Sequence, residues 1–366
     1  QSRAFVSVGL ISYSLYLWHV PIFAFARISD TMVTAFDKFE LISYSVLLSV
    51  ITYVLIEQPF RKSSVIGGKA LVLSLTLTCI CIASFCVLII KNDGFKERMP
   101  AVIKNSYVHE PWFFVKNELG QNCYGTYSKD DFCHFTKEGN EKTIIVVGDS
   151  NIESFSHILT PELLENGFNV ITMNSSACYF MPDFYSVMDG APREIENQPC
   201  DVEFQNKRLE KIEQYPNATI LLGGGLDEYL TPGSYSFKND EGIDIKENYR
   251  TNVKKLLEDG YKVVQLAPMP HFGKHVSQSI LNTTVHYPNL TPHTMKTIVG
   301  HDLKLYEEYT ADAMELLRSI DHPNYTILFP HELMCGTVIN DFCATNDTQN
   351  MFVFDFNHPT KFTGEG

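Results

Sequence analysis

The chain contains 366 residues, of which 45% are hydrophobic and 20% are charged, and it carries a formal net charge of −14. This length is sufficient for two domains, and the composition is that of a globular protein. Because phosphate backbones are bound by basic surfaces, the negative charge argues against a nucleic-acid partner.

Three long apolar stretches occupy the N-terminal part of the chain, at residues 5–28, 41–56 and 70–90. The third contains no acid or base apart from its cysteines, and about twenty helical residues span the roughly 30 Å core of a bilayer. We therefore expect three transmembrane helices. Because the chain opens at Gln1, already within hydrophobic sequence, we also expect it to be the C-terminal fragment of a longer protein.

Basic residues indicate the orientation of these helices. Arg61, Lys62 and Lys69 lie between the second and third stretches, and basic loops mark the cytoplasmic side of a membrane. The third helix is then expected to deliver residues 91–366 to the opposite side, which is lumenal or extracellular.

The cysteines and the glycosylation sequons agree with that location. Three of the nine cysteines lie in the third apolar stretch, and the other six form near pairs that favour disulfides in an oxidising compartment: Cys123 and Cys133, Cys178 and Cys200, and Cys335 and Cys343. Metal ligation is the alternative, but no CxxC or HxxxH spacing supports it, so we expect no metal. Asn-X-Ser/Thr triplets, candidate sites of a glycoprotein, begin at Asn174, Asn217, Asn282, Asn289, Asn324 and Asn346.

The remainder of the chain is expected to form an irregular connector at residues 93–139, followed by alternating strands and helices. Apolar runs predict strands at 143–147, 168–173, 218–223, 261–267 and 325–329, and helical patterns lie near 151–166, 201–214, 246–259 and 300–320. This alternation predicts an α/β fold of the flavodoxin-like type, with a parallel sheet of about five strands and helices on both faces.

Gly148-Asp149-Ser150 directly follows the first of these strands. Ligands bind at the carboxyl ends of parallel strands, and the amides that begin the next helix favour a developing negative charge. Ser150 is therefore a candidate nucleophile, and Asp149 is expected to be structural. The alternative is an ordinary turn that caps a helix.

A second motif, Asp355-Phe356-Asn357-His358, lies near the end of the chain. An Asp and a His three residues apart in a turn can face one direction, so that His358 reaches Ser150 while Asp355 orients the imidazole. Together the motifs provide a Ser-His-Asp triad in the chain order Ser, Asp, His. Taken alone, the Asp-x-x-His motif is also typical of a capped surface turn.

The sequence resembles a known family along nearly its whole length. Ile11-Ser12-Tyr13-Ser14-Leu15-Tyr16-Leu17-Trp18-His19 with Pro21, and Ile56-Glu57-Gln58-Pro59-Phe60-Arg61-Lys62, resemble the end of an acyltransferase 3 membrane domain. Five further segments resemble the SGNH domain that is often fused to this membrane domain. They are Gly148-Asp149-Ser150, Ala177-Cys178, residues 263–270, the late cysteine pair and Asp355-Phe356-Asn357-His358. The density of sequons suggests an animal member, such as a nematode protein.

This resemblance implies four segments and an activity. Residues 1–62 end the membrane domain, 63–92 form a linking helix, 93–139 the connector and 140–366 the SGNH domain. Such proteins transfer acyl groups, usually acetyl, to carbohydrates or lipids. The membrane domain is expected to take acyl from acyl-CoA, with no bound cofactor, and to pass it to Ser150, which hands it to an acceptor hydroxyl with His358 as base and Asp355 as its orienter.

The sequence departs from the family in two places. The early membrane helices, which hold that domain's own catalytic histidine, do not appear in the sequence, so this fragment alone is not expected to perform the transmembrane half of the reaction. The usual asparagine after the third strand is replaced by Gly223-Gly224-Gly225, which leaves the oxyanion donors open. The candidate donors are the N–H of Ser150, Asn174 after the second strand, and an amide such as that of Gly224. Two further functions stay open: an SGNH esterase that uses water as the acceptor, and a non-catalytic lumenal binding domain.

Overall fold

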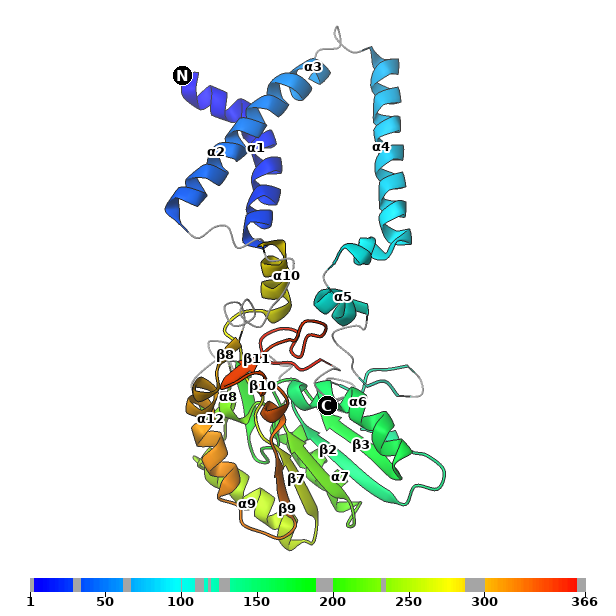
Figure 1. Cartoon of the computed structure of the whole chain (residues 1–366), viewed down its shortest axis with the longest axis vertical. Coiled ribbons are helices and arrows are strands. Elements are labelled where there is room, and N and C mark those ends of the chain that lie inside the picture. Colours follow the sequence, from blue (N-terminus) through cyan, green and yellow to red (C-terminus); the bar gives the residue numbers. More distant parts are fainter. Residues whose placement is uncertain are drawn as a thin grey trace. The chain divides into compact units, whose positions relative to one another are not determined.

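The computed structural model in Figure 1 divides into two compact units, Gln1–Met99 and Pro100–Gly366. It describes residues 3–28, 34–61, 67–99, 101–108, 115–117, 120–124, 132–188, 200–231, 235–286 and 300–360.

The N-terminal unit is built from apolar helices: α1 (Arg3–Ile28), α2 (Ala35–Thr52), the π-helical turn η1 (Tyr53–Glu57), α3 (Gln58–Arg61) and α4 (Gly68–Lys91), followed by the 3-10 segment η2 (Asp93–Arg98). Three stretches are long and apolar enough to cross a membrane: Val8–Arg27, Ala35–Arg61 and Gly68–Lys91. They contain the predicted spans except for residues 5–7 and 28 of the first one. The second begins earlier than predicted because Thr34 and Asp37 form a capping box that starts α2.

Polar contacts join α1 to the second span within this unit. Ser14 donates a hydrogen bond to Glu57, and the indole N–H of Trp18 donates to Thr52 Oγ1 at 2.8 Å. Glu57 also pairs with Arg61 at 3.4 Å, one helical turn away. These contacts satisfy polar groups that would otherwise be costly in an apolar environment.

The C-terminal unit contains a six-stranded sheet in the order β1-β3-β2-β5-β7-β9. Its strands are β1 (Cys133–Phe135), β2 (Lys142–Gly148), β3 (Phe168–Asn174), β5 (Thr219–Gly223), β7 (Lys262–Leu266) and β9 (Tyr325–Leu328). All neighbouring pairs are parallel except β1 with β3. The five parallel strands lie where the sequence predicts them, whereas β1 is an additional edge strand from the predicted connector.

Helices cover both faces of this sheet: α6 (Ser150–Glu165) on one, and α7 (Val202–Glu213), α9 (Ile245–Glu258) and α12 (Leu303–Arg318) on the other. Ile145 and Val147 of β2 point into the larger core, whereas Ile144 and Val146 point towards Ile152 of α6. Each fully buried aliphatic side chain contributes about 1.5–3 kcal/mol. The fold is therefore the predicted α/β arrangement, in which continuous apolar strands are buried on both faces.

Shorter elements surround the sheet. They are α5 (Ala101–Val108), β4 (Tyr185–Met188), α8 (Leu226–Leu230), β6 (Tyr235–Lys238), α10 (Val276–His286), β8 (Gly300–Asp302), η4 (Pro330–Leu333), β10 (Cys335–Ile339) and β11 (Phe342–Ala344). β10, β11 and β8 form a three-stranded sheet, and β4 pairs with β6.

Covalent and surface features of this unit follow the predictions in part. The six cysteines that lie outside the apolar stretches form the three expected disulfides. Among the sequons, Asn217 is exposed, but Asn174 and Asn346 are buried and cannot carry a glycan in the folded protein. Asn289 lies outside the described residues.

Candidate active site

Ser150 lies directly after the carboxyl end of β2, where it is the first residue of α6. β2 is a central strand, with β3 on one side and β5 on the other. The turn requires glycine at position 148, because a Cβ atom there would lie 1.9 Å from the carbonyl oxygen of Gly223 and 2.7 Å from the side chain of Ile152. This close approach lets the chain leave β2 and place Ser150 at the ligand-binding edge of the sheet.

Asp149 ties the Ser150 turn to the loop after β5. One of its carboxylate oxygens accepts the N–H of Asn151 at 2.9 Å, and the other accepts the N–H of Gly225 at 2.9 Å and the hydroxyl of Tyr229 at 3.1 Å. Burial raises the pKa of Asp149, and these three hydrogen bonds oppose the shift. The carboxylate is therefore fully occupied in holding the turn, which is the structural role expected for it.

The structure brings Ser150, His358 and Asp355 into one chain of hydrogen bonds. Nε2 of His358 lies 2.8 Å from Oγ of Ser150, and Nδ1 lies 2.8 Å and 3.0 Å from the two carboxylate oxygens of Asp355. Although burial raises the pKa of Asp355, hydrogen bonds and the charge of His358 outweigh it and lower that pKa to about 2. The carboxylate thus remains ionised at neutral pH and favours the tautomer of His358 in which Nε2 is the acceptor.

Backbone hydrogen bonds fix the segment that carries Asp355 and His358. One Asp355 oxygen accepts the N–H groups of Asn357 at 3.2 Å and of His358 at 3.0 Å, which closes the turn. The carbonyl of Asp355 accepts the N–H of Val276 at 2.8 Å, and that of Phe356 accepts the N–H of Phe272 at 2.7 Å. The loop after β7 and the first residue of α10 therefore hold the segment that places the imidazole opposite Ser150.

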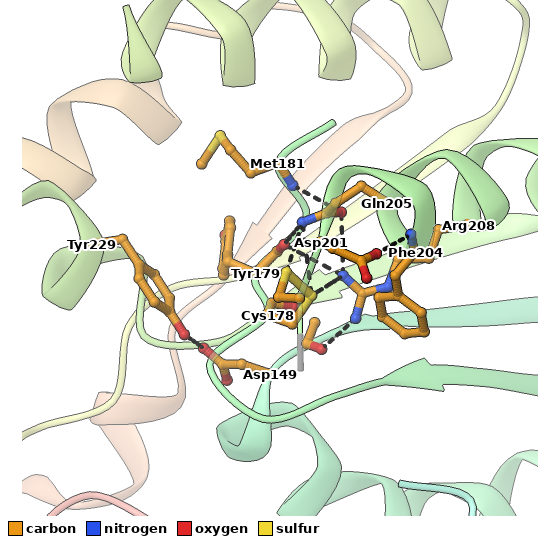
Figure 2. Close-up of a disulfide and its surroundings, with 11 residues drawn as sticks. Asp149, Cys178, Tyr179, Met181, Asp201, Phe204, Gln205, Arg208 and Tyr229 are labelled. Atoms are coloured by element: carbon orange, nitrogen blue, oxygen red, sulfur yellow. Dashed lines mark hydrogen bonds between the residues drawn. A yellow bond between two sulfur atoms is a disulfide. The ribbon is translucent and has the colours of Figure 1, made fainter. Parts of the chain in front are cut away.

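Arg208 of α7 is fully buried beside the same turn and next to a disulfide (Figure 2). Its guanidinium donates to the carbonyl oxygens of Gly148 at 2.9 Å and Cys178 at 3.0 Å, and Cys178 is bonded to Cys200. Burial lowers the pKa of Arg208 to about 9, and the negative charge of Asp149 opposes that shift. A buried cation and a buried disulfide thus support the backbone that precedes Ser150.

The C-terminal part of the chain matches a known protein family. Residues 122–363 match the family described as the SGNH domain fused to AT3 domains. The chain belongs to this family. No curated protein matches its sequence.

Solved structures similar to the chain include two bacterial proteins. One is the periplasmic domain of a lipopolysaccharide acetyltransferase from Salmonella ser. Paratyphi A, with 15% identity, a TM-score of 0.41, and coverage of 62% of this chain and 80% of that one. The other is a GDSL-like lipase from Bacteroides thetaiotaomicron VPI-5482, with 12% identity, a TM-score of 0.28, and coverage of 61% and 82%.

Two of the three oxyanion candidates, Asn174 and Gly224, differ in their surroundings. Asn174 is fully buried, and its amide nitrogen donates to Glu153 at 2.8 Å and to Ser156 at 3.1 Å. Both amide hydrogens are used, so the side chain of Asn174 has none left for an oxyanion, which corrects that part of the prediction. Gly224 has a φ of +141°, and a Cβ there would lie 2.5 Å from an Asp149 oxygen.

A polar cluster that the sequence did not predict lies next to the triad. Oε1 of Glu228 accepts the side-chain amide of Asn357 at 2.6 Å and lies 3.1 Å from Nε2 of His271, while Asp227 lies 3.5 Å from the same nitrogen. Burial raises the pKa of Glu228 to about 8 and lowers that of His271 to about 4. Across the described residues, no three His, Cys, Asp or Glu side chains gather in a way that could hold a metal ion.

Proposed function

We propose that this protein is a membrane-bound O-acyltransferase whose SGNH domain carries the acyl group, acetyl in the simplest case, as an ester of Ser150. The observation that carries the proposal is the continuous hydrogen-bonded chain from Ser150 through His358 to Asp355. Family membership supports an SGNH domain that works together with an acyltransferase 3 membrane domain, to which we assign residues 1–62.

The geometry supports a two-step transfer. Ser150 Oγ attacks the acyl carbonyl while Nε2 of His358 takes its proton, and Asp355 stabilises the imidazolium. As this intermediate collapses, the bond to the leaving group of the acyl donor breaks, the leaving group takes the proton from His358, and Ser150 remains acylated. The N–H groups of Ser150 and Gly224 are proposed to stabilise the oxyanion. An acceptor hydroxyl on a carbohydrate or lipid then attacks the ester, His358 takes the acceptor proton, and the same proton returns to Ser150 as the ester bond breaks.

The proposed setting is an oxidising compartment on the far side of the membrane from the cytoplasm. Three buried or partly buried disulfides and three candidate spans support this placement. Acyl-CoA is the proposed source of acyl groups for the complete membrane domain, since an activated thioester on the cytoplasmic side provides the group that Ser150 receives.

Hydrolysis is the second candidate, because the same triad can deliver the acyl group to water. The side chains of His358 and Asp355 are 17% and 12% exposed to solvent, so water can approach the base. Transfer requires that the acceptor exclude this water when it binds. A non-catalytic binding domain is the third candidate, and the intact triad geometry disfavours it.

The test is product analysis with the full chain in detergent. The chain is given p-nitrophenyl acetate as donor and a methyl glycoside as acceptor, and acetylated glycoside and free acetate are both quantified by mass spectrometry. We expect acetyl glycoside from the wild type and none above background from Ser150→Ala, with Ser319→Ala, at the distant end of α12, as the matched control. Free acetate alone assigns an esterase, and equal product from Ser150→Ala contradicts the proposal.

A further inference from the structure

Glu228 connects α8 to two segments that place the triad. Its Oε1 accepts the side-chain amide of Asn357 at 2.6 Å and lies 3.1 Å from Nε2 of His271. Asn357 directly precedes the base His358, and His271 belongs to the loop after β7, which binds the same segment through backbone hydrogen bonds. A single carboxyl group therefore lies where α8, this loop and the segment of the base meet.

The main chain around Glu228 is itself fixed to the turn that carries the nucleophile. The N–H of Glu228 donates to the carbonyl of Gly225 at 2.9 Å, and the N–H of Gly225 donates to Asp149 at 2.9 Å. The hydroxyl of Tyr229 donates to the same Asp149 oxygen at 3.1 Å. A Cβ at Gly225 would lie 2.9 Å from Oε1 of Glu228, so the carboxyl packs closely against this loop. Glu228 thus relates the position of the base to that of the nucleophile.

The surroundings of Glu228 favour a neutral carboxyl group. Oδ2 of Asp227 lies 3.5 Å from the His271 nitrogen that Glu228 also contacts, so two carboxyl groups meet one imidazole. Burial, together with the negative charges of Asp149 and Asp227, raises the pKa of Glu228 to about 8. Burial lowers the pKa of His271 to about 4, so this imidazole supplies no positive charge at neutral pH. The titratable groups around Glu228 come from five elements and are Asp149, Asp227, Tyr229, His271, Tyr309 and Asp355.

We propose that Glu228 is a positioning residue that, as a neutral carboxyl group, accepts the amide of Asn357 and so holds the base opposite the nucleophile, an inference that rests on the proposed function. When Glu228 loses its proton to solvent, the carboxylate is buried among other acidic groups beside a neutral imidazole, which is costly. Its side chain is 31% exposed, so rotation towards water relieves this cost. The Asn357 amide then loses its acceptor, and the His358 segment is held less firmly.

The expected effect is on rate rather than on affinity. A displacement of about 1 Å at a reacting group costs about 10²-fold in rate. Glu228→Ala removes the acceptor of Asn357, so we expect kcat for p-nitrophenyl acetate to fall by about 10- to 100-fold while KM stays nearly constant. Glu228→Gln keeps an oxygen that accepts the amide and does not ionise, so it should restore kcat at pH 7.

The experiment uses the full chain in detergent, with the rate of Ser150→Ala subtracted as background. It compares the wild type with Glu228→Ala, Glu228→Gln, Asn357→Ala and the double replacement of Glu228 and Asn357 by Ala. Because Glu228 acts through Asn357, Glu228→Ala should lower kcat little further when Asn357 is already Ala. The matched control is Glu258→Ala, since Glu258 is exposed at the end of α9, on the side of the amino end of β7.

The dependence of kcat on pH is a measurement that a merely structural role would not change. We expect the wild type to lose rate as pH rises through about 8, because Glu228 then loses its proton. Glu228→Gln should keep its rate across the same range. This comparison also decides the proposal if Glu228→Ala does not fold, since the amide has nearly the shape of the carboxyl group.

The outcomes separate this proposal from the proposed function. A wild-type kcat in Glu228→Ala, an equal loss in Glu228→Gln, or additive losses with Asn357→Ala overturns the role of Glu228 while Ser150→Ala still abolishes activity. A decline above pH 8 that persists in Glu228→Gln also overturns it, because the titrating group is then a different one, such as Asp227. Full activity in Ser150→Ala instead overturns the proposed function.

Discussion

Arg208 provides a quantitative test of how the Ser150 turn is held. Its guanidinium is fully buried, donates to the carbonyls of Gly148 and Cys178, and stacks 4.5 Å from the centre of the Phe204 ring. Arg208→Met keeps a long side chain against Phe204 but removes the charge and the donors. The variant therefore separates hydrogen bonding and charge from packing.

The expected cost follows from burial. Each hydrogen bond to a charged donor contributes about 1.5–3 kcal/mol. Arg208 donates to the carbonyls of Gly148 and Cys178, so we expect the loss of these two bonds to lower the free energy of unfolding by about 3–6 kcal/mol. A domain of this size loses about 2–4 °C in Tm per kcal/mol, so the transition should fall by roughly 6–24 °C.

The assay is thermal unfolding of the full chain in detergent, followed by circular dichroism. The control is Arg250→Met on α9, whose arginine pairs with Glu247 at the surface at 2.5 Å, and exposed pairs contribute only about 0.2–1 kcal/mol. If Arg208→Met and Arg250→Met lower the transition by the same few degrees, the buried guanidinium does not support the turn and the reasoning is wrong.

Three further predictions concern charge and covalent bonds. Asp355→Asn should cost about 2 kcal/mol near neutral pH, because the folded pKa of Asp355 is about 2 against 3.8 in a free side chain; this difference in melting should disappear as pH falls from about 4 through 2. Burial raises the pKa of Glu153 to about 7 from 4.5, so the folded chain binds the extra proton and loses stability as pH rises through that window. Glu153→Gln should therefore gain about 3 kcal/mol relative to the wild type between pH 4.5 and 8 in the same melts, and a constant difference would contradict the assignment. Joint replacement of Cys178 and Cys200 by Ala, which opens a loop of 22 residues, should cost about 3 kcal/mol in urea unfolding, whereas an unchanged midpoint would show that the disulfide is dispensable.

The parts of the fold and of the site that depend on local sequence pattern could be predicted from the sequence. β2 is a continuous apolar run that ends in Gly148, and this pattern alone placed Ser150 at a strand end. Asp355 and His358 are three residues apart, and the turn between them is closed by local backbone hydrogen bonds. Such short-range geometry is encoded in the spacing of the residues, so the shape of the site could be predicted.

Positions set by tertiary contacts could not be predicted in this way. Arg208 lies in a helix of polar, surface-like composition, and its burial becomes evident only when α7 packs beside Cys178. β1 is three residues long, too short to show a strand period, and it forms because Cys133 pairs with Thr172 of β3. Asn174 is the last residue of β3, at the strand end where an oxyanion donor would lie, but Glu153 from the first turn of α6 engages its amide.

The most direct test of the account is the site at which a fluorophosphonate probe modifies the folded chain, read by peptide mass spectrometry. We predict a single phosphonyl adduct on Ser150, formed rapidly in the wild type and at a greatly reduced rate in His358→Gln. An adduct on a different residue, or equal labelling of Ser150 when His358 is replaced, would contradict a nucleophile activated by that imidazole.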